Sequence, residues 1–283
     1  MELETSSSNR QSQITVPIAI IVAGALIGGA IFLSRTPGAA ILKNEQDEPQ
    51  VASDFAPNVA EPSALSIRPI DGNDHIRGNP DAPIIVVEYS DTECPFCRIF
   101  HETMRKVIDE YGKSGKVAWI YRHLPIVQLH SKAPKEAEAL ECAAEIGGNL
   151  KFWEYADRLF SITPSNDRLD QAELPRIAEF VGLNSALWQS CYESGKYASR
   201  VEQDRKNGEE AGSNGTPYSV LALKNKVSES ATQKILTMNV DMLKRLPPGS
   251  DDPLKISVDG IRVSVGGAFP LPTLKEIIES ILK

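Results

Sequence analysis

The segment from residue 82 to residue 112 most constrains how this chain folds, because it places two cysteines between a strand pattern and a helix pattern. Residues 82–90 ("APIIVVEYS") are β-branched and nearly continuously apolar, which is typical of a buried central strand. The apolar residues that follow recur mostly every three or four positions and predict one helical face: Phe96, Phe100, Met104, Val107, Ile108 and Tyr111. Gly112 ends this helix, and residues 116–125 ("KVAWIYRHLP") predict a second strand. The core therefore begins as strand–helix–strand with a right-handed crossover.

Helical and strand patterns follow one another along the rest of the chain. The pattern is helical from about residue 133 to residue 212, where five large side chains are expected in the core: Phe152, Trp153, Phe160, Phe180 and Trp188. Strand character returns at residues 216–224 and in a hairpin at residues 255–265 around Asp259-Gly260. A further helix is expected at about residues 231–246, and an amphipathic helix closes the chain at residues 271–283.

The sequence Cys94-Pro95-Phe96-Cys97 stands at the start of the first predicted helix. Free backbone N–H groups and the positive end of the helix dipole favour an anion there, and cysteine pKa values in such places fall to roughly 3.5–7.5. Pro95 suits the first helical turn, which needs no N–H. A spacing of three residues returns Cys97 beneath Cys94 on the same face. Cys94 is therefore the candidate nucleophile, and Cys97 is the candidate resolving thiol.

Two other interpretations of this pair remain open at the level of sequence. The pair could be half of a zinc site, or a structural disulfide without catalytic chemistry. Structural zinc takes four ligands, whereas the other two of the four cysteines, Cys142 and Cys191, stand apart. We therefore favour a redox pair, and we expect no metal ion and no organic cofactor.

Residues 14–33 ("ITVPIAIIVAGALIGGAIFL") form an uncharged and almost wholly apolar run. About 20 helical residues span the roughly 30 Å hydrocarbon core of a bilayer. The run predicts a transmembrane anchor at residues 14–34 behind a short cytoplasmic tail at residues 1–13; a cleaved signal peptide and a buried helix are the alternatives. Residues 35–66, rich in Pro, Ala and acidic residues, predict a flexible linker before a globular domain at residues 67–283. The net charge of −8 argues against a nucleic-acid partner.

Taken in order, these pieces resemble the thioredoxin fold, an α/β fold of the pattern βαβ…ββα, and in particular its DsbA-like branch, which carries an inserted helical domain. The resemblance is carried by residues 78–97 ("GNPDAPIIVVEYSDTECPFC"), 121–125 ("YRHLP"), 132–147 ("KAPKEAEALECAAEIG") and 214–217 ("NGTP"), and by the C-terminal hairpin and helix. It covers residues 67–283 and implies a helical insertion at about residues 126–212.

The resemblance also implies further site residues. Pro217 is expected to be a cis proline that faces the cysteine pair, rather than an ordinary proline at the start of a strand. The backbone of Thr216 is expected to pair with a substrate peptide, beside Pro95 and Phe96. Glu88 is expected beneath the resolving cysteine as a proton relay; the alternative is a glutamate at the end of the strand that reaches solvent.

Cys142 and Cys191 are expected to form a structural disulfide, because the family often bridges such a pair; two buried free thiols are the alternative. The bridge would close a loop of about 50 residues and stabilise the fold by about 4 kcal/mol in the chain-entropy model. Disulfides persist in oxidising compartments, so the bridge would place the catalytic domain outside the cytosol and orient the anchor.

Two departures from the family and three neighbouring residues complete the prediction. Phe96 stands where the strongest oxidants of the family carry His, so the oxidising power stays open. The segment of residues 225–253 is longer than the usual link at this place, and it serves either as a partner surface or as a tolerated insertion.

Asp91 and Glu93 are interpreted as solvated loop or capping residues, with tuning of the redox potential as the alternative. His123 is interpreted as a packing residue rather than a site residue.

The sequence thus predicts a single-pass, membrane-tethered thiol:disulfide oxidoreductase with an extracytoplasmic catalytic domain. It would introduce disulfide bonds into exported proteins through a mixed disulfide. The expected partners are thiol-containing exported proteins and a membrane protein that reoxidises the cysteine pair. One rival is a reductase or isomerase that uses the same cysteines. The other is a membrane-anchored binding or chaperone domain with an inert disulfide.

Overall fold

The structure is a computed structural model, and it describes residues 65–283. The predicted tail, the transmembrane anchor and nearly all of the linker lie outside the described residues, so these segments and their bounds stay predictions. Among the helices between residues 65 and 283, none combines the length and the apolar character that crossing a bilayer requires.

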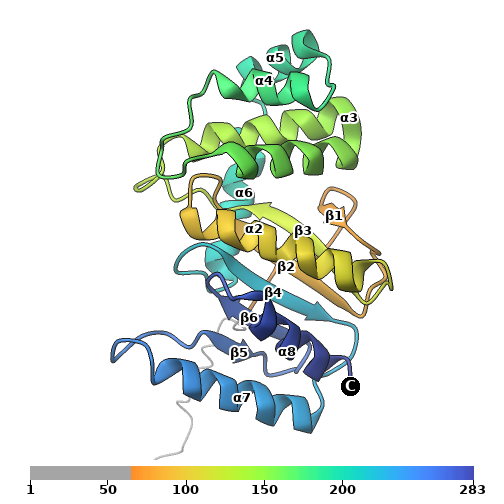
Figure 1. Cartoon of the computed structure of the whole chain (residues 1–283), viewed down its shortest axis with the longest axis vertical. Helices are drawn as coiled ribbons and strands as arrows, with labels where there is room; N and C mark the ends of the chain where they lie inside the picture. Colours follow the sequence, from red (N-terminus) through yellow and green to blue (C-terminus); the bar gives the residue numbers. More distant parts are fainter. Residues whose placement is uncertain (1–64) are drawn as a thin grey trace, which may run out of the picture. The chain divides into compact units, whose positions relative to one another are not determined.

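A six-stranded mixed sheet forms the centre of the described chain, in the order β1-β3-β2-β4-β6-β5. Its strands are β1 (His75–Arg77), β2 (Ile84–Ser90), β3 (Val117–His123), β4 (Tyr218–Leu223), β5 (Leu254–Ile256) and β6 (Arg262–Gly266). Strands β2 and β3 are parallel and are connected through helix α2 (Pro95–Val107), as the strand–helix–strand pattern predicts. Strands β4 and β6 run antiparallel to their neighbours, and helix α8 (Leu271–Ile281) closes the chain (Figure 1). The prediction of a thioredoxin-like α/β fold is confirmed.

Four helices stand between β3 and β4, in the segment whose pattern is helical. They are α3 (Ala133–Ile162), α4 (Glu173–Phe180), α5 (Ser185–Ser194) and α6 (Ala198–Glu210). Gly148 in α3 has a φ of 73°, a left-handed conformation that glycine adopts readily, and α3 is kinked there into two helical parts. Helices α3, α4 and α5 gather at one end of the described chain (Figure 1), whereas α6 contacts β2 and β3.

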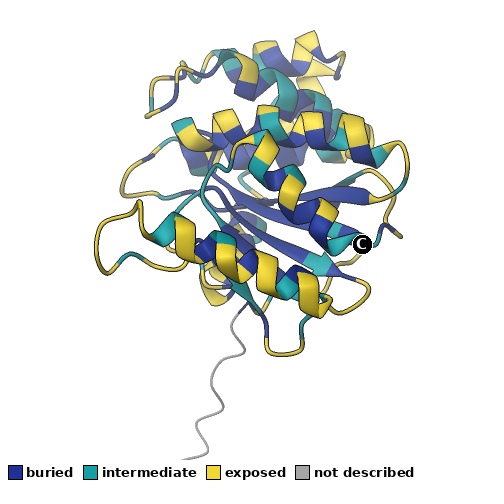
Figure 2. Ribbon diagram, turned by 60° about the horizontal axis from the view of Figure 1, so that its bottom comes forward, coloured by how far each residue is buried: buried dark blue, intermediate teal, exposed yellow. Residues whose placement is uncertain are grey.

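Two apolar cores lie on opposite faces of the sheet, because successive strand residues point to opposite sides. Val86 and Trp119 belong to the larger core, which also takes side chains from α2, α8 and the helical block. Val87 and Ile120 belong to the smaller core, which α6 covers. The central strands β2, β3 and β4 are almost wholly buried, while the helices expose one side (Figure 2). Gly208 lets α6 approach closely, since a Cβ there would lie 2.9 Å from the Tyr89 ring.

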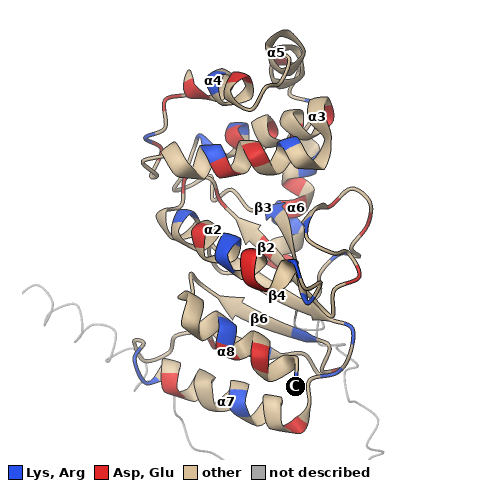
Figure 3. Ribbon diagram, turned by 45° about the vertical axis from the view of Figure 1, so that its right-hand side comes forward, with Lys and Arg blue, Asp and Glu red and all other residues tan. Residues whose placement is uncertain are grey.

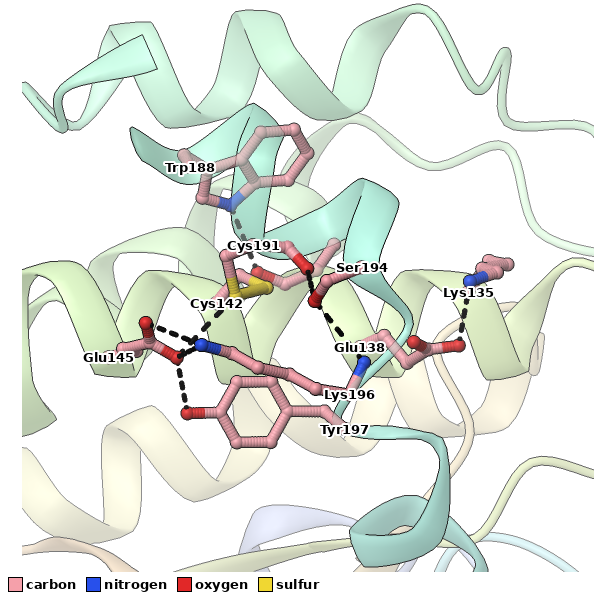
Figure 4. Close-up of a disulfide and its surroundings, with 10 residues drawn as sticks. Lys135, Glu138, Cys142, Glu145, Trp188, Cys191, Ser194, Lys196 and Tyr197 are labelled. Carbon is pink, nitrogen blue, oxygen red and sulfur yellow. Dashed lines mark hydrogen bonds and ion pairs between the residues drawn. A yellow bond between two sulfur atoms is a disulfide. The ribbon is translucent and has the colours of Figure 1, made fainter. Parts of the chain in front are cut away.

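A disulfide joins Cys142 of α3 to Cys191 of α5 (Figure 4). The two cysteines are 49 positions apart, and the bridge ties the short α5 to the long α3. Beside it, the Trp188 indole donates a hydrogen bond to the Ala139 carbonyl at 3.2 Å. In the chain-entropy model a loop of this length makes the bridge worth about 4 kcal/mol.

Residues 225–253, the long segment between β4 and β5, contain helix α7 (Glu229–Leu243). The Ser228 hydroxyl caps its start by accepting a hydrogen bond from the Ala231 N–H. Helix α7 buries Ile235 against the larger core and contacts β5 and α8. Both signs of charge are interspersed along α7 and α8 (Figure 3). The segment is therefore integrated into the fold, and its use as a partner surface stays a prediction.

Two expectations about local structure are wrong in detail. Phe180, expected in the core, is 68% exposed, whereas Phe96, expected beside the substrate, is 61% exposed. Phe96 lies in the first turn of α2, beyond the part of the helix that packs on the sheet, and Phe180 ends α4 with the Arg158 guanidinium 4.3 Å from its ring. The hairpin has a longer connection than a two-residue turn, in which Asp259 accepts hydrogen bonds from the Ser257 hydroxyl and the Ile261 N–H.

Candidate active site

Cys94 stands at the point where the chain leaves β2 and enters α2. It is the residue that precedes the first helical turn, and Pro95 occupies that turn, which needs no N–H donor. Cys94 is 5% exposed and Cys97 is fully buried; both are free thiols. The predicted order of an outer and an inner cysteine therefore corresponds to the geometry of the helix start.

The loop that precedes β4 lies against Cys94. The Thr216–Pro217 peptide bond is cis, and the Cys94 Sγ is 3.4 Å from the Thr216 carbonyl oxygen. The sheet brings these segments together across 122 positions of sequence, since β4 pairs with β2. Phe96 and Ile99, on the first turns of α2, are 61% and 59% exposed and give this end of the helix an apolar surface.

The two thiols have pKa values that are shifted in opposite directions. The pKa of Cys94 is lowered to about 6, chiefly by a hydrogen bond from the Cys97 thiol, with further help from Thr216 and from the backbone N–H groups of Cys97 and Phe96. Burial raises the pKa of Cys97 well above its ordinary value, and the neighbouring Cys94 and Glu88 charges add to this. At neutral pH the outer sulfur is therefore a thiolate and the inner one a thiol.

Glu88 lies in the middle of the sheet and is fully buried, so the alternative of a glutamate that reaches solvent is wrong. Its Oε2 accepts a hydrogen bond from the Trp119 indole at 2.8 Å, while its Oε1 has no protein partner. Burial raises the pKa of Glu88 to about 7, against the lowering effect of Ser90 and Trp119. A carboxyl group with that pKa can give or take a proton at neutral pH.

Asp91 and Glu93 are not solvated as expected, because both are buried beside the cysteine pair. Asp91 accepts hydrogen bonds from the Glu93 N–H at 2.9 Å, from the Ile126 N–H at 2.7 Å and from His130 at 2.9 Å. Its own N–H lies 3.4 Å from the Cys97 Sγ. Asp91 thus fixes the turn between β2 and α2 and ties it to the loop that follows β3.

Glu93 connects the same turn to the helical block. Its backbone carbonyl accepts a hydrogen bond from the Asn166 N–H at 2.7 Å, and its carboxylate accepts one from the Leu169 N–H at 3.2 Å. The Asn166 segment has three consecutive non-glycine residues with positive φ, which is a costly backbone conformation. Glu136 of α3 faces Glu93, and burial together with that neighbouring carboxylate raises the pKa of Glu136 to about 8.

The sequence did not identify Glu136 or Asn166 as residues near the cysteine pair, nor the Glu93 carboxylate as a hydrogen-bond acceptor there. The signal that was present is the run of acidic residues in "PKEAEALE" (residues 134–141), where Glu136, Glu138 and Glu141 are all buried in the structure. Acidic residues on the inner side of an amphipathic helix need partners, and these partners lie in other segments.

His123 is buried, as a packing residue would be, but it also has a charged partner. Its Nε2 lies 2.9 Å from a carboxylate oxygen of Glu141 in α3. Cys142 and Cys191 lie in the helical block and are bonded to each other, so they do not join Cys94 and Cys97 in a shared ligand set.

A reduced Cys-x-x-Cys pair at a helix start, opposite a cis proline and above a buried acid, defines a dithiol protein of the thioredoxin class. A family model described as thioredoxin matches residues 71–242, which is more than half of the chain, and the chain belongs to that family.

Solved structures of DsbA-type proteins share the fold. Wolbachia pipientis alpha-DsbA1 superposes with a TM-score of 0.53 at 22% identity and covers 75% of this chain and 92% of its own. BdbD from Bacillus subtilis, in its oxidised form, gives a TM-score of 0.51 at 21% identity over 64% of this chain and 99% of its own. The thiol-disulfide exchange protein alpha-DsbA2 from Wolbachia pipientis gives 0.52 at 15% identity, over 74% and 87%.

Curated relatives of similar sequence are much longer proteins. Na(+)/H(+) antiporter NhaA 3 of Salinispora tropica is 36% identical over 150 residues, which are 53% of this chain and 22% of the antiporter. Na(+)/H(+) antiporter NhaA 1 of Mycolicibacterium vanbaalenii is 30% identical over 222 residues, 77% of this chain and 32% of the antiporter. Because the chain spans only 22% to 32% of these relatives, the matches carry no transport activity to it.

Proposed function

We propose that this protein is a thiol:disulfide oxidoreductase that introduces disulfide bonds into exported proteins, with Cys94 as the nucleophile and Cys97 as the resolving thiol. The observation that carries the proposal is the opposite shift of the two thiol pKa values at a helix start. A reduced form with a stabilised Cys94 thiolate makes the disulfide form a better oxidant.

The reaction begins from the Cys94–Cys97 disulfide. A substrate thiolate attacks the Cys94 sulfur, the Cys94–Cys97 bond breaks, and a bond forms between Cys94 and the substrate. Cys97 leaves with the electron pair and takes a proton from Glu88, which burial keeps protonated to about pH 7. A second substrate thiolate then attacks the substrate sulfur, a substrate disulfide forms, and Cys94 leaves as a thiolate. The substrate loses two electrons and the protein gains them.

The Thr216 backbone is the proposed site for the substrate chain. Its carbonyl oxygen lies 3.4 Å from the Cys94 sulfur, so an extended peptide paired with this backbone brings its own cysteine to Cys94. Pro95, Phe96 and Pro217 would flank that peptide, and the exposed Phe96 ring offers it an apolar contact.

The cellular setting is part of the proposal. The apolar run at residues 14–33 supports a membrane anchor. The Cys142–Cys191 disulfide supports an oxidising compartment for the catalytic domain, since such bonds are rare in the cytosol. Turnover requires that an oxidant regenerate the Cys94–Cys97 disulfide, and a membrane redox protein fits a tethered domain.

A redox equilibrium with glutathione separates the oxidase from a reductase or isomerase. At pH 7, a Cys94 pKa of about 6 in place of 9.0 stabilises the reduced form by about 1.4 kcal/mol, which raises the potential by about 30 mV. We expect a potential above that of thioredoxin, roughly −270 mV, and a value at or below it would overturn the oxidase assignment.

Trapping of substrates tests the chemistry itself. Cys97→Ala should accumulate mixed disulfides between Cys94 and exported proteins, because the resolving thiol is gone. The matched control is Cys94→Ser, which should trap nothing and lose all turnover. A protein whose activity survived Cys94→Ser would be a binding or chaperone domain instead.

A further inference from the structure

A row of buried polar atoms without protein hydrogen-bond partners lies beneath Cys97. These atoms are Glu88 Oε1, Ser90 Oγ, Tyr121 Oη, His123 Nδ1 and Ser219 Oγ. All five residues are at most 2% exposed. Buried polar atoms normally have a partner, so several such atoms in one place indicate internal water or a moving proton.

The sheet register places these atoms on one face. Glu88 pairs with Tyr121 of β3 on one side and with Ser219 of β4 on the other, while Ser90 pairs with His123. Paired residues of adjacent strands share a face, and Ser90 lies two positions from Glu88 on the same strand. The row therefore runs from Glu88 through Ser90 to His123, within the three strands beneath α2.

The far end of the row reaches the outside of the domain. His123 Nε2 lies 2.9 Å from Glu141, whose carboxylate also contacts His75 at 2.9 Å and the Arg200 guanidinium at 2.8 Å. The His75 and Arg200 side chains are 10% and 24% exposed. A single carboxylate, that of Glu141, therefore separates His123 from the partly exposed side chains of His75 and Arg200.

Glu141 also decides how His123 is oriented. Burial alone would raise the pKa of Glu141, but hydrogen bonds with His123 and His75 hold it well below its ordinary value, so Glu141 is a carboxylate. A carboxylate accepts the Nε2–H of His123, which leaves Nδ1 as the proton acceptor on the other side of the ring. That nitrogen is the buried atom without a partner.

We propose that Ser90 and His123 conduct protons between Glu88 and solvent, through internal water, during the thiol–disulfide exchange proposed above. This inference rests on the proposed function of Cys94, Cys97 and Glu88. It assigns Ser90 and His123 as positioning and conducting residues that do not touch the substrate.

A route for protons is needed at the stage of the mixed disulfide between Cys94 and the substrate. When Cys97 attacks the Cys94 sulfur, the Cys94–Cys97 bond forms, and the substrate sulfur leaves with the electron pair. The Cys97 proton cannot pass to Cys94, whose sulfur is bonded on both sides, so it passes to Glu88. Glu88 is fully buried, and below about pH 7 it already holds a proton, which must leave before Glu88 accepts the one from Cys97. When Cys97 is instead the leaving group, the proton moves inward along the same row.

Charged and titratable groups surround His123 on every side. They are Tyr121 on β3, His75 on β1, Glu141 on α3, and Arg200 and Asp204 on α6, with Asp204 accepting the His123 backbone N–H at 3.3 Å. The Glu141 carboxylate balances the positive charge of His123 while the ring holds a second proton.

The test uses the full-length reduced protein and 5,5′-dithiobis(2-nitrobenzoate), which releases a coloured thiolate twice. The first release reports attack by Cys94, and the second reports attack by Cys97 on the mixed disulfide. Both phases are followed by stopped-flow absorbance from pH 5 to pH 9, in H₂O and D₂O. The first phase is an internal control in Ser90→Ala, His123→Gln and His101→Gln, because it depends on the outer thiolate; Glu88→Gln is excepted, since the Glu88 charge acts on Cys94.

Below about pH 7, where Glu88 starts out protonated, Ser90→Ala and His123→Gln should each slow the second phase about tenfold and enlarge its solvent isotope effect, with the first phase unchanged. The amide in His123→Gln keeps an N–H donor for Glu141 but cannot accept and release a proton. If His123→Gln folds poorly, Ser90→Ala alone tests the proposal. Glu88→Gln should slow the second phase roughly 100-fold. The matched control is His101→Gln, since His101 is also buried, also contacts a carboxylate at 2.8 Å and lies outside the row.

The outcomes separate the two proposals. A wild-type second phase in Ser90→Ala or in His123→Gln, together with a slow one in Glu88→Gln, would overturn the proton route and leave the oxidoreductase intact. A slow second phase in His101→Gln as well would also overturn it, because the effect would then be structural. The absence of a fast first phase in the wild-type protein would instead overturn the proposed function.

Discussion

The lowered pKa of Cys94 has one principal cause, the hydrogen bond from the Cys97 thiol, and removing that donor is a direct test. A hydrogen bond to a charged group contributes about 1.5–3 kcal/mol, and one pKa unit corresponds to about 1.4 kcal/mol. In Cys97→Ala the Cys94 pKa should therefore rise by about one to two units, to roughly 7–8. The thiolate fraction at pH 7 would fall from about 90% to roughly 10–50%.

The assay is a pH titration of thiolate absorbance in the ultraviolet, supported by the pH dependence of alkylation by iodoacetamide. Cys94 is the single free thiol in this variant, because Cys142 and Cys191 are bonded to each other. The matched control is Cys97→Ser, whose hydroxyl can still donate and should keep the pKa closer to about 6. An unchanged Cys94 pKa in Cys97→Ala would refute the reasoning, and would assign the shift to the helix start and to Thr216.

Three further predictions concern stability and substrate binding. Replacing both Cys142 and Cys191 by Ser should lower the free energy of unfolding by about 4 kcal/mol in urea denaturation, with the Cys94 pKa unchanged. Between the unfolded pKa of 4.5 and the folded pKa of about 7, folded Glu88 binds more protons than unfolded Glu88, so stability falls as pH rises through this window. Glu88→Gln should accordingly stabilise the protein by about 3 kcal/mol at pH 8 and have little effect at pH 4, and equal effects at both would contradict this. Phe96→Ser should reduce kcat/KM for an unfolded polypeptide about tenfold while leaving reduction by dithiothreitol unchanged, since only the polypeptide covers the ring.

Local patterns were sufficient to predict the centre of the fold. Residues 82–90 and 116–125 are apolar enough to be buried on both sides, and the helix between them shows regular apolar spacing. Because the cysteine pair is located by these same elements, its position at a helix start followed from sequence. Strand β1 (His75–Arg77) was missed, since three residues carry no periodic signal.

The surroundings of the pair could not be predicted in the same way. Asp91 and Glu93 are charged and stand in a turn, and such residues are usually solvated. Their burial depends on Ile126, Asn166 and Leu169, which other loops bring to the turn. Such tertiary contacts leave no trace in the spacing of residues within one segment.

The pairing of Cys142 with Cys191 leaves Cys94 and Cys97 to each other, so the cysteines pair in the order in which they occur along the chain. Four cysteines allow three pairings, and this is the one in which neither loop encloses or crosses the other. A chain that oxidises as it grows from its amino terminus completes one pair before the next pair exists. Formation of the bonds in this order would therefore give the pairing without rearrangement.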